Sequence, residues 1–125
     1  MFIVNPDKSI FVTRGDIGSI VLRGKPKETG ETYQFKVGDV VRLQICERNN
    51  YNNVVRRKEL VVGDNAAAVA IQLSSEDTKL GEVINKPVDY WYEIELNPET
   101  ACQTLIGHDA DGPKIFRLYP EGADR

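Results

Sequence analysis

The sequence is poor in the residues that metal sites and nucleophilic catalysis require. Among its 125 residues there is one histidine, His108, and there are two cysteines, Cys46 and Cys102, neither in a Cys-x-x-Cys pair. A zinc site needs three or four such ligands, and a catalytic triad needs a nucleophile, a base and an orienting acid in one arrangement. Glycine-rich turns that hold phosphates or dinucleotides are also missing. We therefore expect no catalytic residue, no metal and no cofactor, and interpret His108 as a solvated loop residue.

Long apolar runs are missing as well. No segment approaches the roughly 20 apolar residues that a membrane helix needs. Residues 1–7 break after four apolar positions and have neither the basic nor the apolar region of a signal peptide. We expect a protein that stays in the cytoplasm of the cell that makes it. In that compartment Cys46 and Cys102 are expected to be reduced, partly buried thiols rather than a disulfide.

The sequence also has no excess of positive charge. The net charge is −3 and the isoelectric point is about 5.2, whereas proteins that bind nucleic acid usually carry a basic face. The basic residues are scattered, apart from the run Arg56, Arg57 and Lys58. This run lies inside an apolar stretch, which favours a solvated strand face or edge. We expect neither nucleic acid nor membrane as a partner.

What the sequence does contain is frequent turn chemistry between short runs rich in Val, Ile, Phe and Tyr. Turns at this spacing are typical of a β-sandwich or β-barrel. Several runs alternate between apolar and polar residues, as half-buried strands do, and residues 90–96 are the clearest case. The expected strands are 9–13, 18–22, 32–35, 40–47, 54–62, 67–73, 89–96, 103–106 and 114–119, with residues 1–4 pairing back across a turn at 5–8.

One segment departs from the strand pattern. Residues 74–81 begin with Ser74 at a plausible N-cap, continue with acidic residues and end at Gly81, which are start and stop signals for one or two helical turns. We therefore predict an all-β fold: an immunoglobulin-like antiparallel β-sandwich of about eight strands with one short helical crossover. It should form a single domain over residues 1–125, with an ordered core at about 2–119 and a frayed tail at 120–125.

Trp91 is the most informative aromatic residue, because alternation places it on one strand face with Glu93 and Glu95. Two carboxylates on one face could serve glycoside chemistry, but they more often form the solvent side of a sheet. An exposed tryptophan would suit a protein contact or sugar stacking. If a second sheet covers that face, Trp91 is a core residue. The sequence leaves both alternatives open.

Two short motifs have ordinary interpretations. The tripeptide Arg14-Gly15-Asp16 occurs in cell-adhesion ligands, but here it is best explained as a turn between two strands. Asp109 and Asp111 suggest a fragment of a calcium loop. Too few oxygen ligands follow them, because Pro113 and a strand come next.

A family resemblance enters through the order of several segments. The chain resembles small phage or prophage structural proteins with an immunoglobulin-like sandwich. It is similar to the N-terminal domains of baseplate upper proteins and to related tail-fibre proteins from phages of Gram-positive bacteria. The resemblance extends from about Phe11 to Glu121, and the segments that carry it are 12–20, 33–43, 73–80, 90–96 and 103–106.

This resemblance implies a non-catalytic virion structural or adaptor domain of a tail or baseplate. It would associate with other virion proteins, or with itself as a homo-oligomer, and would reside in the virion after synthesis. By analogy with other sandwiches, the Tyr90 hydroxyl is expected to bond back to a chain corner. The candidate interface residues are Trp91, Tyr51, Arg14 and Asp16. The alternative function is a carbohydrate-binding module, with candidate aromatic residues Trp91, Tyr90, Tyr92, Tyr51 and Tyr33.

Overall fold

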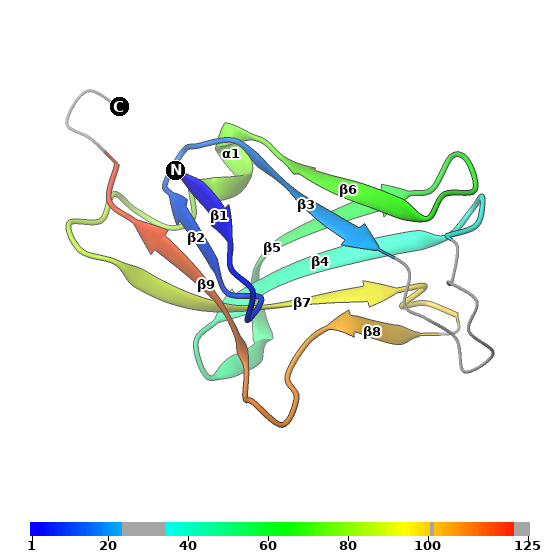
Figure 1. The fold of residues 1–125 in the computed structure, drawn as a ribbon. Helices are drawn as coiled ribbons and strands as arrows, with labels where there is room; N and C mark the ends of the chain where they lie inside the picture. The colour runs from blue at the N-terminus through cyan, green and yellow to red at the C-terminus, as the bar shows by residue number, and fades with distance from the viewer. Residues whose placement is uncertain (24–34, 101, 122–125) are drawn as a thin grey trace.

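The computed structural model describes residues 1–23, 35–100 and 102–121, and it confirms an all-β, sandwich-like fold (Figure 1). The described residues form nine strands and one short helix. Their bounds lie close to those expected from the sequence. The elements are β1 (Phe2–Val4), β2 (Ile10–Thr13), β3 (Gly18–Arg23), β4 (Val40–Glu47), β5 (Asn50–Val61), β6 (Ala68–Leu73), α1 (Ser75–Thr78), β7 (Val88–Leu96), β8 (Gln103–Ile106) and β9 (Lys114–Tyr119).

The two layers are unequal in size. The large sheet has the strand order β1-β2-β9-β7-β4-β5, with β8 also paired to β7, and the small sheet contains β3 and β6. Figure 1 shows the small sheet lying over one face of the large one. The expectation of a purely antiparallel sandwich needs one correction, because β2 and β9 pair in parallel. A tight hairpin can join only antiparallel strands, whereas β2 and β9 are separated by most of the chain and can therefore pair in parallel.

One edge of β7 is shared between two strands. β9 pairs with Val88–Tyr92, whereas β8 pairs with the segment from Ile94 to Leu96. Residues 107–113 therefore leave the sheet at the break between these two strands. This interruption places the loop that carries His108 beside the middle of β7.

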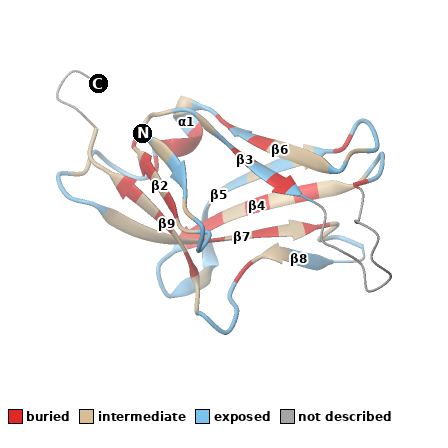
Figure 2. Ribbon diagram, in the orientation of Figure 1, coloured by how far each residue is buried: buried red, intermediate tan, exposed pale blue. Residues whose placement is uncertain are grey.

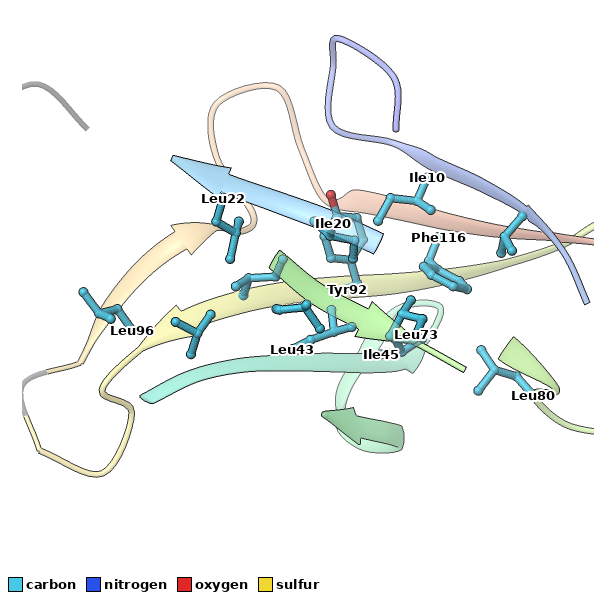
Figure 3. Packing of buried hydrophobic residues seen from close by; sticks show 14 of the residues in the cluster. Ile10, Ile20, Leu22, Leu43, Ile45, Leu73, Leu80, Tyr92, Leu96 and Phe116 are labelled. Carbon is cyan, nitrogen blue, oxygen red and sulfur yellow. The ribbon is translucent and has the colours of Figure 1, made fainter. Parts of the chain in front are cut away.

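The hydrophobic core lies between the two sheets (Figure 3). Figure 2 shows buried positions alternating with more accessible ones along β4, β7 and β9, as expected for strands with one covered face. Ile20, Leu22, Ile71 and Leu73 contribute from the small sheet. The large sheet contributes side chains that include Ile10, Val12, Val41, Leu43, Ile45, Tyr92, Ile94, Leu96, Phe116 and Leu118.

The helical crossover forms where the sequence predicts it. Ser74 is the N-cap of α1, and it forms a capping box with Asp77, which satisfies backbone donors at the start of the helix. The Thr78 hydroxyl accepts a hydrogen bond from the Gly15 amide at 3.0 Å and donates to the Asp16 carbonyl at 2.8 Å. The crossover is thereby bound to the turn that precedes β3.

The basic run Arg56 to Lys58 lies on β5, which ends the large sheet as expected of an edge. The expectation of a fully solvated face needs correction, because Arg56 and Lys58 both reach the buried Asp77 carboxylate. Only Arg57, between them, belongs to the opposite face, where its guanidinium donates to the Gln44 side chain at 3.0 Å.

The corner hydroxyl belongs to Tyr92, not to Tyr90 as predicted. The Tyr92 ring is fully buried and its hydroxyl donates a hydrogen bond to the Lys8 carbonyl. Tyr90 and Tyr92 are two residues apart on β7, so both side chains point to the same, inward face of the sheet, and alternation alone does not distinguish them. Burial raises the pKa of the Tyr92 hydroxyl, with a smaller contribution from the charge of Asp7.

Two further expectations concern the chain near its gaps and its end. Of the expected strand at residues 32–35, only Phe35 is described, and it forms an isolated bridge with Ala66. The expectation of a frayed tail from residue 120 needs correction at Glu121, which accepts a 2.6 Å hydrogen bond from Arg14. Residues 122–125 lie outside the described part of the chain. None of the helical structure in the described residues is long and apolar enough to cross a membrane.

Candidate functional site

The outer face of the large sheet, which is turned away from β3 and β6, is the candidate site. Strand register arranges its side chains in rows that cross the strands. One row is apolar and contains Ile115, Trp91, Cys46 and Val54. Trp91 is half-buried on this face, so the alternative in which a second sheet covers it is wrong.

Three rings gather over the apolar row and form what we call the aromatic cluster: Tyr51, Trp91 and His108. The centroids of Tyr51 and Trp91 are 5.0 Å apart, with the ring planes tilted by 44°. His108 meets Trp91 nearly edge-on, at 6.0 Å and 87°. The Tyr51 hydroxyl lies 3.4 Å from His108 Nδ1. These separations are those of directly packed aromatic rings.

The cluster depends on the interruption between β8 and β9. Gly107 leaves β8 with its backbone so close to the sheet that a Cβ atom there would lie 2.6 Å from Thr104 Cγ2. That approach places the next residue, His108, within reach of Trp91. Tyr51 arrives from the opposite side, near the start of β5.

A polar row on one side of the cluster is internally paired. Arg117 donates two hydrogen bonds to Asp89, at 2.7 and 3.2 Å, and lies over the Phe11 ring at 5.3 Å. Hydrogen bonds from Arg117 lower the pKa of Asp89. Phe11 also meets Tyr119 edge-on at 5.7 Å. This side of the outer face thus combines aromatic surface with neutralised charge.

The other side is a network of acidic and basic residues. Arg42 bridges the carboxylates of Glu59 and Glu99 at 3.0 and 2.8 Å. The Gln44 amide donates to Glu95 at 3.0 Å, and the Cys102 thiol donates to the second oxygen of Glu95 at 2.9 Å. The network gives the outer face a polar rim on this side, which is the usual surround of an interface core.

Glu93 lies between the aromatic cluster and this network, and its carboxylate has no hydrogen-bond donor among the described residues. Burial raises the pKa of Glu93, and the neighbouring charge of Glu95 adds to the effect. The Tyr51 pKa is also raised, first by burial and then by Glu93. No serine or cysteine nucleophile hydrogen-bonds to His108 within the described ranges, where its hydrogen-bond contact is with the Tyr51 hydroxyl.

The structure brings together two of the four expected interface residues, Trp91 and Tyr51. Arg14 instead lies inside the fold, where its guanidinium donates to the carbonyls of Leu80 and Gly81 and to Glu121. Asp16 pairs with the amino group of Met1. The turn interpretation of the tripeptide is confirmed, with Gly15 at φ +89°. We do not retain Arg14 and Asp16 as interface residues, because their charged groups are engaged within the fold.

Sequence reasoning placed His108 correctly in an exposed loop but missed its contact with Trp91 and Tyr51. That contact depends on where β8 stops pairing with β7, and no local signal marks that point. Both cysteines are free, Cys46 buried and Cys102 exposed, so the expectation of partial burial fails for Cys102. Tyr33 lies outside the described residues.

Asp109, the residue that suggested a calcium loop, is engaged within its own turn. It accepts hydrogen bonds from the Asp111 amide and from Lys114 Nζ, both at 2.9 Å. Across residues 1–23, 35–100 and 102–121 there is no group of three or more His, Cys, Asp or Glu side chains that could hold a metal. Comparison with protein-family models, with curated proteins and with solved structures found no match to this chain.

Proposed function

We propose that this protein is a non-catalytic association domain that binds other proteins through the outer face of its large sheet. The observation that supports this most strongly is the aromatic cluster on the outer face, in which Trp91 and Tyr51 are half-buried and His108 is exposed. Tryptophan and tyrosine are enriched among residues that dominate binding energy, particularly where a paired polar rim surrounds them. Here Asp89–Arg117 and the Arg42 network form such a rim.

The class of assembly rests on the sequence resemblance alone. On that basis we propose a virion structural or adaptor protein of a phage or prophage tail or baseplate, whose partners are other virion proteins or further copies of the chain. A virion part must bind at least one neighbour stably. The outer face offers the side chains of several adjacent strands for that purpose, whereas substrate binding would favour a deep apolar pocket.

The carbohydrate-binding alternative receives less support from the geometry. Sugar stacking requires an accessible flat aromatic face. Tyr51 packs against Trp91 at 5.0 Å and His108 meets it edge-on, so the three rings mainly contact one another.

Light scattering coupled to size-exclusion chromatography tests the proposal. A stable trimer, hexamer or larger ring that Trp91→Ala reduces to smaller species would support association through the outer face. Val21→Ala is the matched control, because Val21 is an exposed apolar residue on β3, away from that face. A wild-type chain that remains a 14.0 kDa monomer would count against self-assembly through this surface, as would an assembly that Trp91→Ala leaves intact.

A further inference from the structure

The edge of β5 beyond Tyr51, at residues 55–61, is a second surface. In the described residues β5 pairs only with β4. Val62 directly follows β5, and its amide donates to the Asp39 carbonyl at 2.8 Å. The backbone N–H and C=O groups of even-numbered residues in β5 therefore face β4. In an antiparallel pair these directions alternate. The backbone groups of Arg57, Glu59 and Val61 therefore point away from the sheet, where a further strand would bind.

We propose that this edge pairs antiparallel with the same edge of a second copy, with Arg57 of each chain opposite Glu59 of the other. The two large sheets would then be continuous across a twofold axis, as in an isologous dimer. The contact goes beyond the proposed function, because it specifies a different surface and commits to a second copy as the occupant.

Charge complementarity selects the register. Only the odd-numbered residues of β5 direct their backbone N–H and C=O groups toward the second copy. Every register that forms hydrogen bonds between the two strands therefore places odd-numbered residues opposite one another, and the two copies can shift only in steps between such registers. One step in one direction would place Arg57 opposite Arg57, and one step in the other would place Glu59 opposite Glu59. Like charges directly opposite each other are unfavourable, whereas opposite charges stabilise a strand pair. The proposed register forms the Arg57–Glu59 pair twice.

The same register pairs the exposed valines of the edge. Val61 is 63% exposed and Val55 is 37% exposed in the single chain, and each would lie opposite the other across the axis. They would flank the two charge pairs on the outer face. The β-bulge opposite Ile45 and Cys46 limits the regular pairing at Val55.

Charged side chains that point inward from an edge strand usually prevent that strand from pairing with the edge of another chain. Here the charges concerned are Arg56 and Lys58, and both are bound by the Asp77 carboxylate, at 2.5 and 2.8 Å. At the axis Lys58 would face Lys58 of the second copy. Each ammonium keeps its own Asp77 as counter-ion, which reduces their repulsion.

Sedimentation equilibrium with charge-reversal variants tests this register. The wild-type chain should reach at least twice its mass of 14.0 kDa between micromolar and millimolar concentration. Arg57→Glu alone and Glu59→Arg alone should each weaken dimerisation by about tenfold or more, because each places like charges opposite one another twice. An equimolar mixture of the two variants should restore the dimer, since every opposed pair is then of opposite sign.

Several outcomes would overturn the proposal: a wild-type monomer at millimolar concentration, single variants that dimerise as well as wild type, or a mixture that stays monomeric. Should either charge variant fail to fold by circular dichroism, Val61→Lys replaces it, because a residue already 63% exposed tolerates a polar side chain; it should also give monomers. Trp91→Ala should leave this dimer intact, so failure of the edge contact is distinguishable from failure of the outer-face interface.

Discussion

Arg56 of the edge strand β5 donates two hydrogen bonds to the buried Asp77 carboxylate of α1, at 2.9 and 2.5 Å. Lys58 reaches the second carboxylate oxygen at 2.8 Å, and the Ser74 amide and hydroxyl donate to that same oxygen. A carboxylate without solvent access needs such compensation. The contact fastens the helical crossover to the last strand of the large sheet.

Replacing this carboxylate should destabilise the fold measurably. Asp77→Asn keeps the size of the side chain but removes the charge that Arg56 and Lys58 share. Hydrogen bonds to charged groups contribute about 1.5–3 kcal/mol, and we expect a loss of about 2 kcal/mol in the free energy of unfolding. Urea denaturation at neutral pH measures it. Asp64→Asn, at an exposed position in the loop after β5, is the matched control and should be near neutral.

The same carboxylate should make the protein sensitive to acid. Burial alone would raise the Asp77 pKa, but the hydrogen bonds from Lys58, the Ser74 amide and Arg56 outweigh it and hold the pKa well below the ordinary 3.8. A lowered folded-state pKa contributes stability that is fully present above the unfolded value and is lost as the pH falls. The free energy of unfolding should therefore decrease progressively below about pH 4.

Asp77→Asn distinguishes this group from the other carboxylates. The variant should be less stable than wild type at neutral pH, and the difference between the two should shrink as the pH is lowered below 4. Urea denaturation across this range measures the difference. A constant difference at every pH would show that the Asp77 charge does not account for the acid sensitivity.

The buried Tyr92 hydroxyl gives a third prediction. Tyr92→Phe removes the hydrogen bond to the Lys8 carbonyl while retaining the ring, and it should cost about 1 kcal/mol. Tyr90→Phe is the control, because the Tyr90 hydroxyl makes no hydrogen bond within the described residues, and its effect should be close to zero. Thermal denaturation of both variants compares them. Equal effects would contradict the assignment of the corner hydroxyl to Tyr92.

These residues also show how far the sequence alone leads. Alternation in residues 90–96 correctly separated Trp91 from Tyr92, and the turn and capping signals located the strands and α1. Pairing between distant strands has no local signal, so the parallel β2–β9 contact and the position of His108 were not predictable. Burial of Arg14 likewise depends on the approach of Leu80, Gly81 and Glu121 from elsewhere in the chain.

Gly107 provides a fourth prediction, about how the aromatic cluster is held. Gly107→Ala would place a methyl group 2.6 Å from Thr104 Cγ2, closer than carbon atoms approach, and overpacking of this kind costs about 1–3 kcal/mol. The loop should shift and carry His108 away from Trp91. The fluorescence of Trp91, the sole tryptophan, should change. Adding Thr104→Ser removes the clashing methyl group and should restore the wild-type spectrum, whereas an unrestored spectrum would contradict this account of the loop.

The fluorescence of Trp91 also tests most directly the claim that the outer face is an association surface. The emission spectrum of Arg57→Glu, a variant in which pairing of the β5 edge is weakened, is recorded at increasing protein concentration while light scattering reports the assembled fraction. If the outer face forms the interface, the emission should shift to the blue in step with assembly, because the half-buried indole loses its remaining contact with water. Assembly that proceeds with an unchanged Trp91 spectrum would contradict the claim.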